Sequence, residues 1–164
     1  MIKEKTLLDK IQVYKLEPFK DHRGEFIELY NKEDYDINLD FIQDDISISH
    51  KDVIRGIHGD MKTWKLISCL NGEFLAVVVE CDIKSKQRWR WESIRLSREN
   101  TLQLLIPPTY GLGVRALKDN SILHYKQTEY YEGSYKQFTY RWDDQRIGID
   151  WGITNPILSK RDSK

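Results

Sequence analysis

Short segments rich in Val, Ile, Tyr, Phe and Trp recur along the 164-residue chain, and this recurrence constrains its fold more than any other feature. Their lengths and spacing are typical of strands in a sandwich or barrel. Only Thr6–Lys10 and Lys32–Tyr35 have a weak helical pattern. Strands are expected at Ile11–Leu16, Glu25–Tyr30, Phe41–Ser49, Trp64–Leu70, Glu73–Cys81, Arg88–Leu96, Thr101–Ile106, Leu112–Leu117, Ser121–Thr128 and Tyr135–Trp142.

Turn residues and apolar runs indicate how these strands connect. Asn71-Gly72 separates two of them and predicts a two-residue hairpin, in which both turn positions need positive φ. The run from Phe74 to Val79 is continuously apolar, which predicts a strand buried on both faces. Pro107-Pro108 cannot continue a ladder, so the chain leaves the sheet there. No linker or repeat divides the chain, and we expect one all-β domain, a sandwich or barrel, over residues 1–164.

Charge and cysteine content limit the partners of this domain. Its 26 basic side chains equal its 26 acidic ones, which argues against a protein that binds nucleic acid or an anionic membrane electrostatically. The charged first ten residues do not resemble a signal peptide, and no apolar run is long enough to span a bilayer. Cys69 and Cys81 lie in apolar segments and are expected to be reduced and structural. We expect a cytoplasmic protein.

His58 is the first candidate for chemistry. A lone histidine near the end of a strand is ordinarily a satisfied surface or turn residue. Three features favour a function: Gly56 and Gly59 would allow close approach of a ligand, Arg55 suits a phosphate or carboxylate, and Lys65 enters an apolar strand. Lys65 either snorkels to solvent or places an ammonium in a cavity. The four histidines have no metal-ligand spacing, so we expect no metal site.

The segment Ser121–Thr128 alternates, and one of its faces is expected to line something polar. Tyr125 is then either a core phenol with a satisfied hydroxyl or a proton donor. Asp21-His22-Arg23-Gly24 reads as a turn. Trp89 and Trp91 are expected on one packed face of a strand. From the residues alone, the prediction stops at an all-β fold with a suggestive set of His, Lys and Tyr.

An ordered set of motifs resembles the dTDP-4-dehydrorhamnose 3,5-epimerase family. Asp21–Glu28 is similar to its D-x-R-G-x-F-x-E motif, Phe41–Ser47 to F-x-Q-D-N-x-S, and Arg55–His58 to R-G-L-H. Further matches follow in order at Ser97–Asn100, Ile106-Pro107, Tyr125–Tyr131, Trp142–Asp144, Ile147–Trp151 and Leu158–Asp162. The variant around Ile57–Leu66 resembles relatives that epimerise GDP-linked 4-keto heptoses for bacterial capsules.

The resemblance implies a cupin-type jelly roll with short peripheral helices, working as a homodimer without a metal or organic cofactor. Its substrate would be a nucleoside-diphosphate 4-keto-6-deoxy sugar, epimerised at C3, at C5 or at both. The resemblance assigns the base to His58, its carboxylate partner to Asp162, the enolate-stabilising cation to Lys65 and the opposing acid to Tyr125. It assigns substrate contacts to Arg23, Phe26, Glu28, Gln43, Asp45, Arg55 and Tyr131.

The chain departs from the family pattern at three places. Leu112 stands where the family has a histidine, Asp45 replaces an asparagine, and Gly59-Asp60 follows His58 where the family has an H-x-Q-like motif. These departures leave the nucleotide, the sugar and the number of inverted centres open. Two alternatives remain beside the epimerase: a ketoisomerase or single-site epimerase that does not use Tyr125 as donor, and a non-catalytic nucleotide-sugar-binding cupin.

Overall fold

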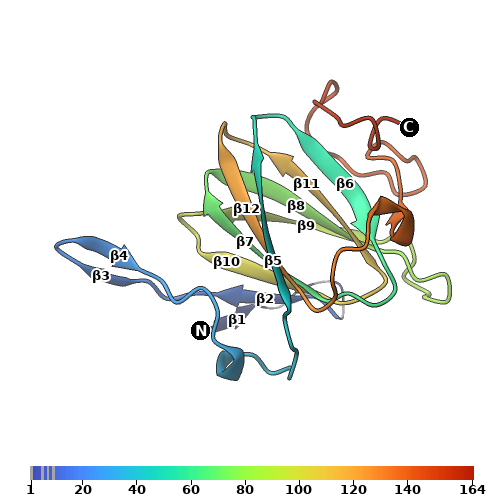
Figure 1. The fold of residues 1–164 in the computed structure, drawn as a ribbon. Coiled ribbons are helices and arrows are strands. Elements are labelled where there is room, and N and C mark those ends of the chain that lie inside the picture. Colours follow the sequence, from blue (N-terminus) through green and yellow to red (C-terminus); the bar gives the residue numbers. More distant parts are fainter. Residues whose placement is uncertain (1, 5, 7, 9) are drawn as a thin grey trace.

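Two antiparallel sheets face each other in the computed structural model, which describes residues 2–4, 6, 8 and 10–164 (Figure 1). The six-stranded sheet has the order β1 (Ile2–Glu4), β2 (Gln12–Lys15), β10 (Leu102–Ile106), β7 (Lys65–Asn71), β12 (Ser121–Gln127) and β5 (Gln43–Ser49). The five-stranded sheet has the order β13 (Phe138–Thr139), β6 (Ile54–Gly59), β11 (Tyr110–Ala116), β8 (Glu73–Glu80) and β9 (Trp91–Ser97). The predicted all-β jelly roll is confirmed.

The main core lies between the two sheets. Ile67, Leu104 and Leu123 of one sheet pack in the same cluster as Phe74 and Val78 of the other. The alternate side chains of β8 point outward but are also buried, because they belong to a second cluster beneath the C-terminal segment. The prediction of a strand buried on both faces over Phe74–Val79 is therefore confirmed.

Irregular segments cover the outer faces of both sheets. The segment 30–41, which includes the short 3-10 helix η1 (Lys32–Asp34), packs Tyr30, Tyr35 and Phe41 over the six-stranded sheet. The C-terminal segment runs beside β6, where Ile57 and Tyr140 exchange two backbone hydrogen bonds of 3.0 Å. A second 3-10 helix, η2 (Ser134–Lys136), precedes this segment. Because the C-terminal segment packs along β6, the end of the chain lies next to His58.

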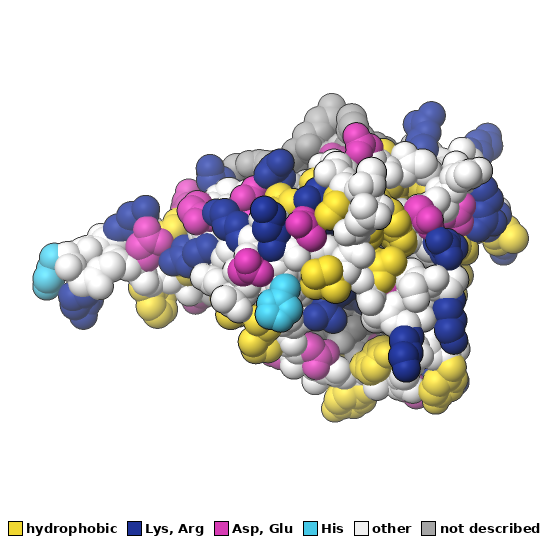
Figure 2. Space-filling model, turned by 90° about the horizontal axis from the view of Figure 1, so that it is seen from above, with side chains coloured by type: hydrophobic (Ala, Val, Ile, Leu, Met, Phe, Trp, Pro, Cys, Tyr) yellow, Lys and Arg dark blue, Asp and Glu magenta, His cyan; other side chains and the backbone are white. Residues whose placement is uncertain are grey.

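A hairpin of β3 (Phe19–Asp21) and β4 (Gly24–Phe26) projects away from the two sheets (Figures 1 and 2). The predicted turn at 21–24 joins its strands. The expected strand Glu25–Tyr30 is wrong beyond Phe26, because the chain leaves the hairpin there and reaches the outer face of the six-stranded sheet.

The predicted hairpin at Asn71-Gly72 is also wrong. β7 and β8 belong to different sheets, so the turn is a corner between the layers. Gly72 has φ of 73°, as a tight corner requires, whereas the side-chain amide of Asn71 donates to the carbonyl of Asn120 at 2.9 Å. The prediction that the chain leaves the sheet at Pro107-Pro108 is confirmed, since β10 ends at Ile106.

Other boundaries differ from expectation where tertiary packing overrides local propensity. Trp89 has φ of 72° and precedes β9, so it does not share a strand face with Trp91. The expected strand Tyr135–Trp142 shortens to the two residues of β13. The helix predicted at Lys32–Tyr35 appears as η1, while that at Thr6–Lys10 lies partly outside the described residues, and its described positions are not helical. β1, β3 and β6 are additional strands.

Gly56 allows β6 and β11 to approach closely beside His58. Its φ is 118°, and a Cβ there would lie 2.5 Å from the carbonyl oxygen of Leu112 and 2.6 Å from Cα of Gly113. A Cβ at Gly59 would lie 2.3 Å from the ring of Phe138. The expectation that these glycines admit a ligand is therefore wrong, because the space is taken by neighbouring parts of the chain.

Candidate active site

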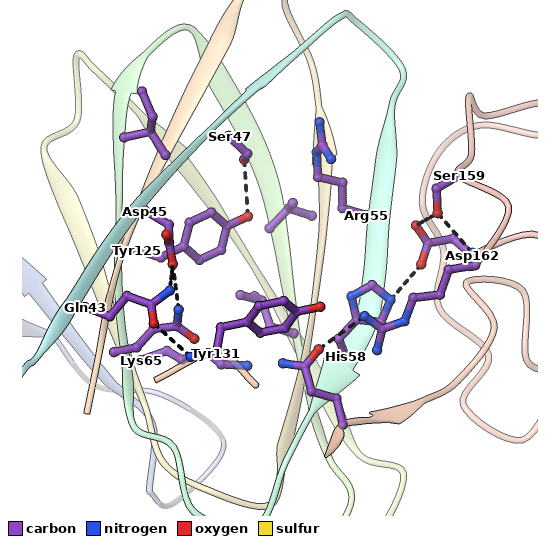
Figure 3. A pocket seen from close by; sticks show the side chains of 16 residues that line it. Gln43, Asp45, Ser47, Arg55, His58, Lys65, Tyr125, Tyr131, Ser159 and Asp162 are labelled. Atoms are coloured by element: carbon purple, nitrogen blue, oxygen red, sulfur yellow. Dashed lines mark hydrogen bonds and ion pairs between the residues drawn. The ribbon is translucent and has the colours of Figure 1, made fainter. Parts of the chain in front are cut away.

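A cavity of about 470 Å³ opens between the two sheets (Figure 3). Its walls combine inward side chains of β5, β7 and β12 with those of β6 and β11, and the C-terminal segment closes one side. The lining residues are Gln43, Asp45, Ile46, Ser47, Arg55, His58, Lys65, Leu112, Val114, Tyr125, Gln127, Tyr131, Gln137, Ser159, Arg161 and Asp162.

His58 and Asp162, 104 residues apart in the sequence, meet at this cavity. His58 Nε2 lies 2.7 Å from Oδ1 of Asp162, whose side chain is almost completely buried. A carboxylate accepts only, so Nε2 carries the hydrogen and Nδ1 is the basic nitrogen. Nδ1 makes no hydrogen bond within the described part of the chain. The contact within this dyad of His58 and Asp162 therefore selects the tautomer in which the lone pair on Nδ1 can take a proton.

Lys65 is the first residue of β7 and is only 8% exposed. Burial lowers the pKa of its ammonium, and the nearby charge of Arg161 lowers it further, while Asp60 opposes both. Among the described residues, Lys65 forms no ion pair within 4.0 Å. The expectation of an ammonium inside a cavity is thus realised, and the alternative of a lysine that snorkels to solvent is not.

Tyr125 and Gln127 reach the cavity from β12, and Leu123 on the same face of the strand packs in the core. His124 and Lys126 point to the opposite face, where both contact Asp44, so the face that carries Tyr125 is the one that lines the cavity. The hydroxyl groups of Tyr125 and Ser47 lie 3.3 Å apart. Burial raises the pKa of the Tyr125 phenol, so it keeps its proton at neutral pH.

Gln43, Asp45 and Gln127 form a hydrogen-bonded wall on the side of Tyr125 (Figure 3). The two amide groups donate to the same oxygen of Asp45, at 2.7 Å from Gln43 and 2.8 Å from Gln127. The backbone N–H of Tyr131 donates to Gln43 at 2.8 Å, which holds the segment of Tyr131 at the cavity. This wall offers acceptors, the second oxygen of Asp45 and the carbonyl of Gln127, to a ligand that carries hydroxyl or N–H donors.

Cationic groups dominate the other side of the cavity. Arg55 donates to Ser49 Oγ at 3.1 Å and to the carbonyl of Ile48 at 3.3 Å, which fixes its guanidinium. Arg161 is held by Thr139 Oγ1 at 2.7 Å and by Gln137 Oε1 at 3.2 Å. Together with Lys65, these groups favour an anionic ligand or a developing negative charge.

Leu112 lies directly beside the dyad, because it pairs with His58 across β6 and β11. It lines the cavity with Val114, and both are mostly buried. The departure from the family histidine therefore makes an apolar wall next to the basic nitrogen.

Three predicted substrate contacts lie outside the cavity of this chain. Arg23 and Phe26 belong to the projecting hairpin, and Glu28 follows it exposed to solvent. Arg23 is engaged with Asp21 at 2.6 Å, while Phe26 is 71% exposed. The structure brings together His58, Lys65, Tyr125, Asp162, Gln43, Asp45, Arg55 and Tyr131, but not these three.

Sequence reasoning did not single out Gln127, Gln137, Ser159 and Arg161 as site residues. Gln127 had a usable signal, because it alternates with Tyr125 on one strand. Ser159 and Arg161 stand in the same matched motif as Asp162. Gln137 had none, since it lies in an irregular segment whose position only the folded chain defines.

Both cysteines are free and buried, as expected. Burial raises the pKa of the thiols to about 11 for Cys69 and about 12 for Cys81, which leaves them unreactive at neutral pH. In the described part of the chain, no three side chains of His, Cys, Asp or Glu gather as a metal site requires. The helices of this part are also too short to cross a bilayer.

The fold is a jelly roll with a cavity between its sheets that is lined by ionisable side chains, an arrangement found in sugar-nucleotide isomerases. Comparison with known proteins identifies the family. The family model described as dTDP-4-dehydrorhamnose 3,5-epimerase matches residues 5–164, and the chain belongs to that family of isomerases. It is 34% identical to the dTDP-4-dehydrorhamnose 3,5-epimerase of Salmonella typhimurium over 99% of this chain and 93% of that protein.

Solved structures agree with this membership. The dTDP-6-deoxy-D-glucose-3,5-epimerase of Legionella pneumophila, in complex with dTDP-4-keto-L-rhamnose, superposes with a TM-score of 0.93 at 30% identity. The match covers 99% of this chain and 89% of that one. A 3′-monoepimerase of Streptomyces bikiniensis, in complex with dTDP-quinovose, has a TM-score of 0.90 at 25% identity and covers 96% and 83% of the two chains. The chain is therefore an isomerase of nucleotide sugars.

Proposed function

We propose that this enzyme epimerises a nucleoside-diphosphate 4-keto-6-deoxy sugar at C3, at C5 or at both, by proton abstraction next to the ketone. The observation that carries the proposal is the arrangement of His58, Lys65 and Tyr125 around one cavity, with Asp162 bound to the far nitrogen of His58. The buried phenol of Tyr125 keeps its proton, as a donor requires.

In the first step, Nδ1 of His58 takes the proton from the carbon next to the C4 ketone. The electron pair of the broken C–H bond moves onto the ketone oxygen, which becomes an enolate oxygen. The buried ammonium of Lys65 stabilises this oxygen as its charge develops, and Asp162 stabilises the imidazolium that forms on His58. No external oxidant or reductant takes part.

In the second step, the carbon receives a proton on its other face. The phenol of Tyr125 donates this proton, and the configuration is thereby inverted. The phenolate then recovers a proton from solvent, and His58 releases the one it took. The hydroxyl of Ser47, 3.3 Å away, orients the phenol.

Tyr125→Phe is expected to separate the two steps. In deuterated water, the variant should still exchange the abstracted hydrogen through His58, while inverted product falls by about 100-fold or more because the opposing donor is gone. NMR of the recovered sugar measures exchange and configuration together. Tyr135→Phe, at a side chain 79% exposed, is the control and should behave as wild type. Unchanged inversion by Tyr125→Phe would assign the donor elsewhere.

The chemistry of the cavity supports a nucleotide sugar as substrate. Arg55 and Arg161 suit the diphosphate, and the acceptor wall at Asp45 suits sugar hydroxyls or base N–H groups. Relatives of known structure were solved with dTDP sugars, which makes dTDP the first nucleotide to test. Leu112 and Asp45 motivate a second test with GDP-linked heptoses, the substrate suggested by the motif around His58 and consistent with capsule synthesis.

We also infer that residues 1–164 form one domain that works as a homodimer in the cytoplasm. The hairpin supports the dimer, because its exposed Phe19 and Phe26 leave apolar area for a second copy to cover. Arg23 and Phe26 on this arm would then complete the cavity of the neighbouring subunit. Mixing a His58→Asn variant with an Arg23→Ala variant should restore activity, since one site of each mixed dimer is intact. If the mixture has no more activity than the two variants measured separately, or if the protein sediments as a monomer, this arrangement is contradicted.

The experiment that tests the function is incubation of dTDP-, GDP- and CDP-linked 4-keto sugars with the enzyme in deuterated water. Deuterium at C3, C5 or both identifies the centres that are inverted. Migration of the carbonyl would identify a ketoisomerase instead. Binding without exchange of any substrate would favour the non-catalytic alternative.

A further inference from the structure

Ser159 lies behind the dyad and contacts Asp162 twice. Its hydroxyl donates to Oδ2 of Asp162 at 2.7 Å, and the backbone N–H of Asp162 returns a hydrogen bond to Ser159 Oγ at 3.2 Å. His58, Asp162 and Ser159 thus form one chain of hydrogen bonds along the side of the cavity that the C-terminal segment closes (Figure 3).

We propose that Ser159 is a positioning residue for the reaction: it fixes the rotation of the Asp162 carboxylate, and through it the ring of His58. This inference rests on the proposed function of His58 as the base. Oδ1 of Asp162 accepts from His58 and Oδ2 accepts from Ser159, so hydrogen bonds to both oxygens fix the orientation of the carboxylate plane. With the second contact removed, the carboxylate keeps the hydrogen bonds from His58 and from the backbone of Gly56, but its rotation is less restricted.

The ring orientation matters because the reactive nitrogen is Nδ1. Nε2 must carry the hydrogen for Nδ1 to be basic, and the contact of 2.7 Å to Asp162 is what selects this tautomer. Gly56 already brings β6 close to β11, so the backbone of His58 has little freedom to compensate. A carboxylate that turns would therefore leave the imidazole in a mixture of tautomers and orientations.

The charge of Asp162 also depends on Ser159. Burial opposes ionisation of this carboxyl, but hydrogen bonds from His58 and Ser159, and one from the backbone of Gly56, hold its pKa below the usual range. An ionised Asp162 stabilises the imidazolium formed when His58 takes a proton. Ser159 thus supports the same step by geometry and by charge.

The same C-terminal turn offers a matched control. Ser163 is exposed, and within the described part of the chain its hydroxyl contacts only the carbonyl of Lys160, at 3.4 Å, without reaching the dyad. Ser159→Ala and Ser163→Ala each remove one hydroxyl from this turn. A difference between them reports on the contact with Asp162, whereas a general loosening of the turn affects both. Ser159→Thr keeps the hydroxyl and tests rescue.

The experiment measures kcat and KM with the nucleotide sugar that the wild-type enzyme turns over. We expect Ser159→Ala to lower kcat by about 10- to 100-fold, as for other residues that orient a reactive group, with KM within about twofold. Ser159→Thr should restore most of kcat, and Ser163→Ala should match wild type. A ¹H–¹⁵N spectrum should show the Nε2–H tautomer of His58 in wild type and a mixture in Ser159→Ala.

Three outcomes would overturn the proposal: an unchanged kcat in Ser159→Ala, an equal loss in Ser163→Ala, or an unaltered tautomer. The proposed function is tested separately by solvent exchange in the wild-type enzyme. A wild type that exchanges no substrate refutes that function, whereas an active wild type with a fully active Ser159→Ala refutes only the role of Ser159.

Discussion

His58→Asn is expected to lower epimerisation and solvent exchange by about 1,000-fold or more, because no other group takes the proton at that face. The amide of asparagine ends at the level of Nδ1 and does not reach the position of Nε2, so the variant also loses the direct contact of 2.7 Å with Asp162. Its side chain has no basic nitrogen at neutral pH. Nucleotide affinity should stay within about threefold of wild type, since the diphosphate contacts belong to other residues.

Steady-state kinetics and deuterium incorporation measure the loss, and calorimetric binding of the nucleotide measures what is retained. His50→Asn provides the control, because His50 is 82% exposed at its side chain and lies outside the cavity. Exchange that persists at the wild-type rate in His58→Asn would remove His58 from the role of base. A loss of nucleotide binding of the same size as the loss of exchange would assign it to binding instead.

Lys65→Met is expected to lower kcat by about 100- to 1,000-fold, the effect of removing one preorganised group that stabilises an oxyanion. Methionine fills nearly the same volume and carries no charge. The variant should nevertheless be more stable than wild type by roughly 1 kcal/mol, because it relieves the burial of an ammonium that has no ion pair among the described residues. Function and stability therefore oppose each other at this position.

The stability difference should depend on pH in a defined direction. Burial lowers the pKa of Lys65 from its ordinary value of 10.5, so the unfolded chain binds more protons than the folded one between the two values. Wild-type stability then rises with pH in that window. The advantage of Lys65→Met is fully present below the folded pKa and shrinks as pH approaches 10.5. Denaturant unfolding at pH 7 and pH 10 measures it.

Lys118→Met is the matched control for both effects. Lys118 is half exposed and pairs at the surface with Glu73, so its replacement should change neither kcat nor the pH dependence noticeably. A Lys65→Met enzyme that retains full kcat would assign enolate stabilisation to another fixed cation of the cavity, Arg55 or Arg161. A variant that is less stable at neutral pH would show that Lys65 contributes packing that outweighs the cost of its burial.

Local patterns predicted most of the strands, because alternation and apolar runs depend only on neighbouring residues. Phe74–Val79 was recognised as doubly buried and Ile106 as the end of a strand. Asn71-Gly72 was misjudged, because the same dipeptide suits a hairpin and a corner between sheets, and only the pairing partners decide which forms. The tail near Tyr140 was misjudged as a full strand for a related reason, since its conformation follows from packing on β6.

The site divides in a similar way. Motif order in the sequence identified His58, Lys65, Tyr125 and Asp162, and the cavity contains all four. Their chemical properties depend on tertiary contacts, which positions along the sequence do not reveal. These contacts are the hydrogen bond to Nε2 that makes Nδ1 the basic atom, the burial of Lys65, and the amide groups bound to Asp45. The matched motif contains Ser159, but only its contact with Asp162 indicates a role for it.

The amino-acid sequence by itself determined the fold class, the family and the identity of the candidate catalytic residues, because these follow from periodicity and from the order of motifs along the chain. Tertiary structure alone decided which glycines serve packing, which face of β12 lines the cavity, and that Arg23 and Phe26 lie far from it on a projecting hairpin. The physical reason is that His58 and Asp162, which are 104 residues apart in the sequence, can form the hydrogen bond that sets the tautomer of His58 only when folding brings their atoms into contact.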